Sequence, residues 1–313
     1  MSSSTMQAVV FKGVREIIIE DRPIPTCKDS TDVVIKVHIT ALCGSDLHVY
    51  RGHEPSETDF IMGHEFFGEV IEVGSDVKQF KMGDRIVVPF STSCGTCFYC
   101  RKALTSRCET SQLFGSPLLN GGQAEYVRIP FADSTAFPVP KNISDDLMVL
   151  MGDIFPTGYF AAKNAWTLLS EKERDDPNLT AVVVGCGPVG LCAITAACER
   201  FPIVYAIDSV EERLEEAKKH GAISINLNND PISIIKKATE GRGADAVMEI
   251  VGHADALRLA YDLIRPWALE LFSKKQHLFT NFISHRMNLS DAVKAYELFD
   301  NRLARKIIFD LRK

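Results

Sequence analysis

The sequence lacks an excess of basic residues, which argues against binding to nucleic acid. Lys and Arg number 35 against 41 Asp and Glu, giving a net charge of −6 at pH 7. With a pI near 5.8, the chain has no electrostatic footprint for phosphate backbones or anionic membrane surfaces. We therefore expect neither nucleic acid nor a membrane as a partner.

The sequence also lacks an internal repeat, a low-complexity segment and the features of a secretory signal. Its start, MSSSTMQAVVFKG, has neither a basic flank nor an apolar core. One uncharged run, residues 179–198, is long enough to cross a bilayer. Its valine-rich start, three glycines and Pro188 instead favour a buried strand, a tight turn and a helix. We expect a cytoplasmic protein.

The sequence divides into two regions that differ in their pattern of expected strands and helices. Its length of 313 residues favours about two domains. Residues 6–150 contain short β-type runs separated by glycine and proline, typical of a compact, mostly β domain. From about residue 155, strand-like runs such as TAVVVG, IVYAIDS and DAVMEIVG alternate with helical segments. Such βα units predict a parallel, doubly wound sheet.

A glycine motif opens the second region. Gly185, Gly187 and Gly190 form G-x-G-x-x-G directly after a predicted strand, where backbone can approach a pyrophosphate at a helix N-terminus. The next strand ends in Asp208, whose carboxylate can accept hydrogen bonds from ribose hydroxyls and would repel a 2′-phosphate. NAD is therefore favoured, while Arg213 could accommodate a 2′-phosphate and leaves NADP open.

Residues 91–108 hold four cysteines with the spacing C-x2-C-x2-C-x7-C. Such a run can form a disulfide knot, an iron–sulfur cluster or a zinc site. Nine cysteines without a secretory signal indicate a reducing compartment, where disulfides are rare. A ferredoxin-type run has three residues before its last cysteine and a proline after it, whereas seven residues precede Cys108 and Glu109 follows. Zinc is the preferred interpretation.

Two further segments, ALCGSDLH and IMGHEFFGEV, carry thiol, imidazole and carboxylate groups in the β region. A catalytic zinc needs about three protein ligands and one open position. Cys43 and His64 can supply two, and Asp153 offers a third from an otherwise apolar segment. A lone buried aspartate would be costly without a cation or hydrogen-bond partners. Each residue alone could be structural, but the set beside a nucleotide fold favours a metal site.

Together, CGSDLH, GHEFFGEVIEVG, the four-cysteine run and GCGPVG resemble the zinc-containing medium-chain alcohol dehydrogenase family along nearly the whole chain. Aspartate in GDIFPTGY, where many members have cysteine, is most similar to the branch of glutathione-independent formaldehyde dehydrogenases. The resemblance implies an α/β protein with a GroES-like, mostly β catalytic domain at 1–155. It also implies a Rossmann coenzyme domain at 156–276 and a segment at 277–313 that returns to the catalytic domain.

The resemblance implies roles for individual residues. Cys43, His64 and Asp153 would hold a catalytic zinc, Glu65 would be a nearby carboxylate able to exchange with water, and Asp46 would support the ligands. Ser45 and His48 match the family's proton relay. The four cysteines match a structural zinc site that is closed to substrate: Cys94, Cys97, Cys100 and Cys108.

The implied activity is a zinc-dependent transfer of hydride between a small alcohol or aldehyde and NAD, with two zinc ions per chain. A non-catalytic or impaired zinc- and nucleotide-binding relative is the alternative. A pure binder would need neither an open zinc position nor a relay, so the site residues favour the enzyme.

One departure from the family follows Pro266. The family continues with a glycine-rich turn, a strand, a crossover and a sixth strand, whereas Trp267 here runs directly into ALELFSKKQHLF. About two strands, on the order of 30 to 45 residues, are missing. The sheet should then have four parallel strands, with 246–251 at an open edge. In the family, the missing region holds cofactor and forms the dimer contact. We therefore expect weaker NAD binding, a tendency to aggregate, and the family's homodimer or tetramer to be altered or absent.

Overall fold

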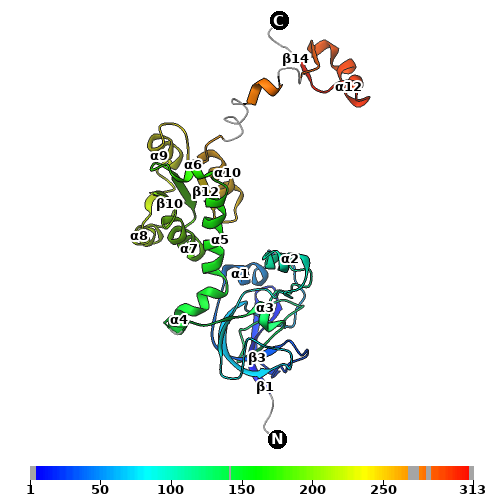
Figure 1. Cartoon of the computed structure of the whole chain (residues 1–313), viewed down its shortest axis with the longest axis vertical. Helices are drawn as coiled ribbons and strands as arrows, with labels where there is room; N and C mark the ends of the chain where they lie inside the picture. The colour runs from blue at the N-terminus through cyan, green and yellow to red at the C-terminus, as the bar shows by residue number, and fades with distance from the viewer. Residues whose placement is uncertain (1–4, 141, 267–274, 280–282, 310–313) are drawn as a thin grey trace.

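The amino-terminal part of the computed structural model is a β domain made of two antiparallel sheets (Figure 1). The structure describes residues 5–140, 142–266, 275–279 and 283–309. One sheet has the order β2-β1-β4 and the other β7-β3-β5-β6-β8. The strands are β1 (Thr5–Gly13), β2 (Glu16–Pro23), β3 (Val33–Ala41), β4 (Phe60–Ile61), β5 (Glu65–Val73), β6 (Arg85–Val88), β7 (Tyr126–Ile129) and β8 (Phe137–Pro138).

Alternating side chains of the larger sheet form the core of this domain. Val33 and Ile35 of β3 pack with Phe66 of β5 and with Phe114 from a loop, all fully buried. The rings of Phe66 and Phe114 meet edge to face, with centroids 5.1 Å apart. Short helical segments cover the ends of the sheets: α1 (Gly44–Tyr50), α2 (Phe98–Arg101), η1 (Thr105–Arg107), α3 (Ala132–Thr135), α4 (Asp145–Met148) and η2 (Val149–Gly152).

The second part is a parallel, four-stranded sheet in the order β11-β10-β9-β12, with helices on both faces (Figure 1). All five residues of β9 are buried, and alternate ones enter the separate apolar clusters on the two faces. The elements are α5 (Ile154–Thr167), α6 (Glu171–Arg174), β9 (Thr180–Val184), α7 (Pro188–Cys198), β10 (Ile203–Asp208), α8 (Glu211–Lys219), β11 (Ile223–Asn226), α9 (Pro231–Ala238), β12 (Ala246–Glu249) and α10 (Ala254–Leu263).

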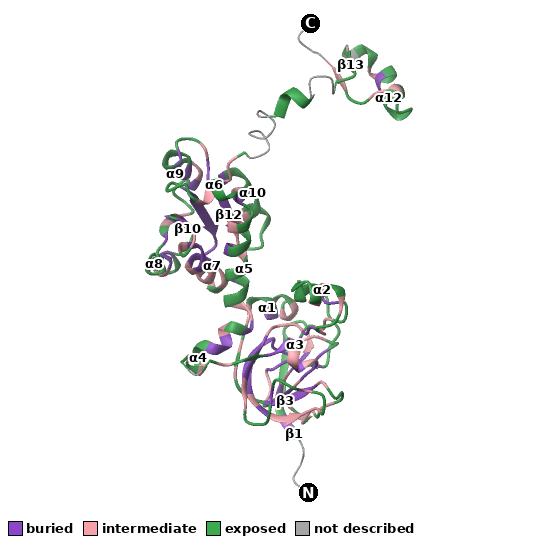
Figure 2. Cartoon of the chain, viewed as in Figure 1, coloured by how far each residue is buried: buried purple, intermediate pink, exposed green. Residues whose placement is uncertain are grey.

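This arrangement confirms two sequence-based predictions about the fold. The sheet has four parallel strands, and β12 lies at its edge. The uncharged run at 179–198 forms the buried strand β9, a turn and the helix α7, which is buried along one side (Figure 2). Within the described part of the chain, no helix has the length and apolarity that a bilayer crossing requires.

The helix α5 joins the two domains. It begins directly after Asp153 and packs against α7 of the coenzyme domain. The contact is close: a Cβ on Gly158 would lie 2.5 Å from the backbone nitrogen of Ala193. A residue at the start of α5 is therefore held at the junction between the domains.

The carboxyl-terminal segment contains η3 (Gln276–Phe279), β13 (His285–Met287), η4 (Leu289–Asp291), α12 (Ala292–Asp300) and β14 (Ile307–Phe309), with β13 parallel to β14. This segment lies beyond the coenzyme domain, at the end of the molecule opposite the catalytic domain (Figure 1). The domain bounds expected from the sequence, including the return of 277–313 to the catalytic domain, stay a prediction.

Candidate functional site

Four side chains from three distant segments meet at the junction of the two domains. The ligand atoms of Cys43, His64, Glu65 and Asp153 all lie within 4.8 Å of one another. Cys43 immediately precedes α1, His64 and Glu65 lie at the start of β5, and Asp153 precedes α5. The structure thus brings together four residues that the sequence analysis singled out.

Asp46 contacts the side chain of His64 and the backbone of Cys43. Its Oδ1 lies 3.2 Å from Nδ1 of His64, and its Oδ2 accepts a 2.9 Å hydrogen bond from the backbone N–H of Cys43. A proton held on Nδ1 leaves Nε2 of His64 free as a ligand. That Nε2 lies 3.4 Å from Asp153 Oδ2, which in turn is 3.6 Å from Cys43 Sγ. The three ligand atoms therefore face a common point.

The electrostatics of this cluster favour a cation. Burial alone would lower the pKa of His64, but hydrogen bonds to the carboxylates of Asp153 and Asp46 raise it to about 12. Burial, followed by the charge of Asp153, raises the pKa of Glu65. The Oε1 atom of Glu65 is buried and has no hydrogen-bond partner. Sulfur, imidazole and carboxylate donors are the ligands that zinc binds, so the residues fit that metal.

Thr157 was missed by sequence reasoning, although its position one helical turn after Asp153 is a usable signal. Its hydroxyl donates a 2.8 Å hydrogen bond to Oδ1 of Asp153. Burial alone would raise the pKa of Asp153, but hydrogen bonds from His64 and Thr157 lower it. Asp153 is therefore held as a carboxylate, the form that binds a metal.

A cavity of about 380 Å³ opens beside this cluster. Ser45 lines it, with Oγ 3.2 Å from Nε2 of His64. His48, one turn further along α1, is exposed, with its ring centroid 5.9 Å from that of His53. The remaining lining was not predicted, because it comes from loops whose packing the sequence does not reveal: Val49, Glu54, Met62, Phe90, Leu113, Phe114 and Gly115.

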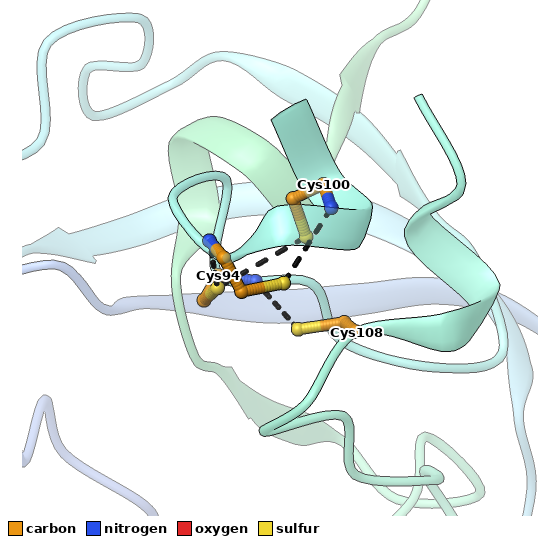
Figure 3. A group of neighbouring side chains, drawn as sticks. Cys94, Cys100 and Cys108 are labelled. Carbon is orange, nitrogen blue, oxygen red and sulfur yellow. Dashed lines mark hydrogen bonds between the residues drawn. The ribbon is translucent and has the colours of Figure 1, made fainter. Parts of the chain in front are cut away.

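The four-cysteine run forms a second cluster, and its ligand atoms also lie within 4.8 Å of one another. Figure 3 shows Cys94, Cys100 and Cys108 pointing toward one another, with 4.0 Å between the sulfurs of Cys94 and Cys100. The backbone and hydroxyl of Thr96, and then the N–H of Cys97, lower the pKa of Cys94 to about 5. All nine cysteines are free thiols in this structure. Four thiols around one point fit a tetrahedral zinc site.

A larger cavity, of about 630 Å³, lies where β9, β10 and β12 end. Gly185, Gly187, Asp208 and Arg213 all line it. Gly185 has φ +96°, and a Cβ on Gly190 would lie 2.0 Å from the Gly185 carbonyl oxygen. The tight turn and the close strand–helix approach therefore both depend on glycine.

The carboxylate of Asp208 is 8% exposed and positions the loop around this second cavity. It accepts hydrogen bonds from the N–H groups of Cys186 (2.8 Å) and Val210 (2.9 Å). Arg213 approaches it to 3.7 Å. The cavity lies at the carboxyl ends of parallel strands, where such sheets bind nucleotides, and it fits a nicotinamide dinucleotide.

Two family models match the chain. Residues 29–141 match the alcohol dehydrogenase GroES-like domain, and residues 188–269 match the zinc-binding dehydrogenase model. The second match ends two residues after Trp267, where the sequence departs from the family pattern.

Curated proteins and solved structures agree with this match. Zinc-type alcohol dehydrogenase B of Aspergillus flavus is 44% identical over 352 residues, covering 98% of this chain and 82% of that protein. Medium chain reductase/dehydrogenase ucsI of Acremonium sp. is 53% identical over 272 residues, covering 85% and 92%. Alcohol dehydrogenase TADH from Thermus sp. ATN1 superposes with a TM-score of 0.77 at 31% identity, covering 96% of this chain and 99% of that one.

The alignment with the Aspergillus protein is longer than the 313 residues of this chain. That relative therefore carries residues that have no counterpart in this chain. By its domain matches, its relatives and its fold, the chain belongs to the zinc-type, medium-chain alcohol dehydrogenase family and is a zinc-dependent oxidoreductase with a nicotinamide cofactor.

Proposed function

We propose that the protein transfers a hydride from a small alcohol to NAD, giving the aldehyde, NADH and a proton, or runs the same reaction in reverse. The observation that carries the proposal is the meeting of Cys43, His64 and Asp153 beside an open cavity. These three would hold a catalytic zinc, and the four cysteines of the second cluster a structural zinc. A zinc ion in the first position supplies Lewis-acid polarisation of the substrate oxygen.

The protein's own residues then handle the proton. Ser45 lines the cavity and has its hydroxyl within hydrogen-bond distance of the metal cluster, so it is placed to accept the proton of the substrate hydroxyl. His48 is exposed on the same helix and would pass that proton to water. Glu65, buried with an unpartnered oxygen, would approach the metal when water or substrate exchanges.

The preference for NAD rests on Asp208. Its buried carboxylate lines the nucleotide cavity, where it would bind ribose hydroxyls and repel a 2′-phosphate. Asp208→Ser, with Arg213 retained, should move the ratio of NADP to NAD dissociation constants toward NADP by about tenfold or more. Asp208→Asn removes the charge but keeps an acceptor for the loop N–H groups. It therefore distinguishes the effect of the charge on cofactor preference from the effect of losing the loop hydrogen bonds. If the ratio of NADP to NAD dissociation constants is unchanged in both variants, Asp208 does not set the cofactor preference.

The aspartate at position 153 supports placing this protein near the glutathione-independent formaldehyde dehydrogenase branch of the family. Formaldehyde dismutase of Pseudomonas putida is 33% identical over 83% of this chain, less than the two fungal relatives. The nine free cysteines support a reducing, cytoplasmic location. Because β12 is an edge strand, we also propose that any dimer or tetramer differs from that of longer family members.

The alternative, a non-catalytic or impaired relative, has less support because the metal cluster keeps both its cavity and Ser45. The test is to measure zinc per chain by mass spectrometry and then NADH formation with a panel of alcohols. We expect two zinc ions and turnover of at least one alcohol. A metal-replete protein that turns over no alcohol and reduces no aldehyde would contradict the proposed activity.

A further inference from the structure

The cavity beside the metal cluster is larger and more apolar than a one-carbon substrate requires. Its volume of about 380 Å³ lies in the range of sites that enclose multi-carbon ligands. Aromatic and aliphatic side chains form much of its wall, including Met62, Phe90 and Phe114. With a one-carbon aldehyde bound, these apolar side chains would stay exposed to water, whereas a larger apolar substrate would bury them.

Glu54 is the one carboxylate of the cavity wall that lies outside the metal cluster and does not orient its ligands. Asp153 belongs to the cluster of ligand atoms within 4.8 Å, and Asp46 holds His64 and Cys43. Glu54 is in neither group and stands on the loop after α1, its backbone N–H 3.2 Å from the carbonyl oxygen of His48.

The charge of Glu54 is not used by its neighbours. Among the residues that the structure describes, its side chain takes part in no hydrogen bond or ion pair, and no lysine or arginine lines the cavity. An exposed carboxylate without a partner, on the wall of a mostly apolar cavity, can select the charge of what enters.

We infer that the substrate is an alcohol or aldehyde with an apolar body of several carbons and a hydrogen-bond donor, cationic or neutral, away from the reacting carbon. Glu54 accepts that donor, and it disfavours substrates that carry a carboxylate there. This inference rests on the proposed function, because it assumes that the cavity beside the metal cluster is where the alcohol binds.

The test compares four matched probes on the zinc-loaded protein: benzyl alcohol and its para-aminomethyl, para-hydroxymethyl and para-carboxylate derivatives. We expect kcat/KM for the aminomethyl probe to exceed that for the carboxylate probe by about tenfold or more. Glu54→Gln should collapse most of this ratio. Glu57→Gln, an equal change of an exposed acid on the same loop that does not line the cavity, should leave the ratio as it is.

Calorimetric binding of the same four probes supplies a readout that does not depend on turnover. If benzyl alcohol is oxidised but the ratio stays near one, or Glu57→Gln collapses it as strongly as Glu54→Gln, the inference is wrong and the proposed function stands. If no probe turns over but binding keeps the order and its dependence on Glu54, the proposed activity fails while the charge selection holds. If binding shows neither the expected order of probes nor a dependence on Glu54, the inference is overturned.

Discussion

The two metal clusters of this protein each bring together four ligand atoms within 4.8 Å of one another, but the chain supplies these atoms in different ways. The four thiols lie within residues 94–108, so a single loop brings them together. In the other cluster, Cys43 and Asp153 are 110 residues apart and meet only when β5, α1 and α5 have packed. The first cluster can organise a lobe, while the second depends on the whole junction between domains.

The clusters also differ in chemistry. Four like sulfurs can fill a tetrahedral shell, which leaves no position for substrate. The mixed cluster adds imidazole and carboxylate groups, contains an unpartnered oxygen of Glu65 and opens onto a cavity. We therefore expect a substitution in the mixed cluster to change activity and a substitution in the thiol cluster to change stability.

The largest expected effect is that of His64→Ala. Removing a ligand of the mixed cluster should lower turnover by at least about 10³-fold, since metal-ion catalysis contributes several kcal/mol to the transition state. The midpoint of thermal unfolding should fall by only a few degrees. His38→Ala, on the neighbouring strand β3 and outside both clusters, is the matched control. Substantial remaining turnover in His64→Ala would place the reaction elsewhere.

Cys97→Ser should show the opposite pattern. Loss of one thiolate from a structural zinc site should lower the free energy of unfolding by about 3 kcal/mol or more, because that metal contributes directly to folding. Turnover per folded molecule should change much less than in His64→Ala. Cys192→Ser replaces a half-buried thiol outside both clusters and should have a small effect. Equal losses of unfolding free energy in Cys97→Ser and Cys192→Ser would contradict a structural role for the thiol cluster.

A smaller effect is expected from Asp46→Asn, which keeps the shape of the side chain but weakens its hold on His64. Groups that orient metal ligands typically contribute 10- to 100-fold to metal affinity or activity, so zinc affinity of the mixed cluster should fall by that range. The thiol cluster should keep its zinc. Asp21→Asn, an exposed change on β2, controls for the charge. If both variants bind zinc like the parent, Asp46 does not support the ligands.

The smallest expected effect is on the metal-free protein. Burial raises the pKa of Glu65 in the folded state, so folding favours its protonated form and this contribution is lost as the pH rises through the folded pKa. Glu65→Gln should therefore raise the unfolding midpoint at pH 7 by a few degrees, and the gain should shrink as the pH falls toward 4. Glu69→Gln, on the same strand, should give no such pH-dependent gain.

Much of this fold could be predicted from the sequence because its signals are local. Strand–helix alternation predicted a parallel sheet, and the break from the family pattern after Pro266 predicted four strands with β12 at the edge. The thiol cluster could also be predicted from the sequence, since its four cysteines lie within one loop. Cys43, His64 and Asp153 could be proposed as a set from their chemistry, and the family resemblance then implied their roles, because no local pattern joins residues so far apart.

What the sequence could not predict depends on packing between distant loops. The apolar wall around Phe90 and Phe114, and the place of Glu54 in it, follow from how several loops meet. The course of the carboxyl-terminal segment also depends on such packing, and the return of 277–313 to the catalytic domain stays a prediction.

The most direct test of the two-cluster account is native mass spectrometry of the metal-replete protein during titration with a mild chelator, with folding followed by circular dichroism. The account predicts two zinc ions per chain. The first should leave with all activity while the fold persists, and the second should leave only as the protein unfolds. A protein that binds one zinc or none, or loses both together in a single unfolding step, would contradict it.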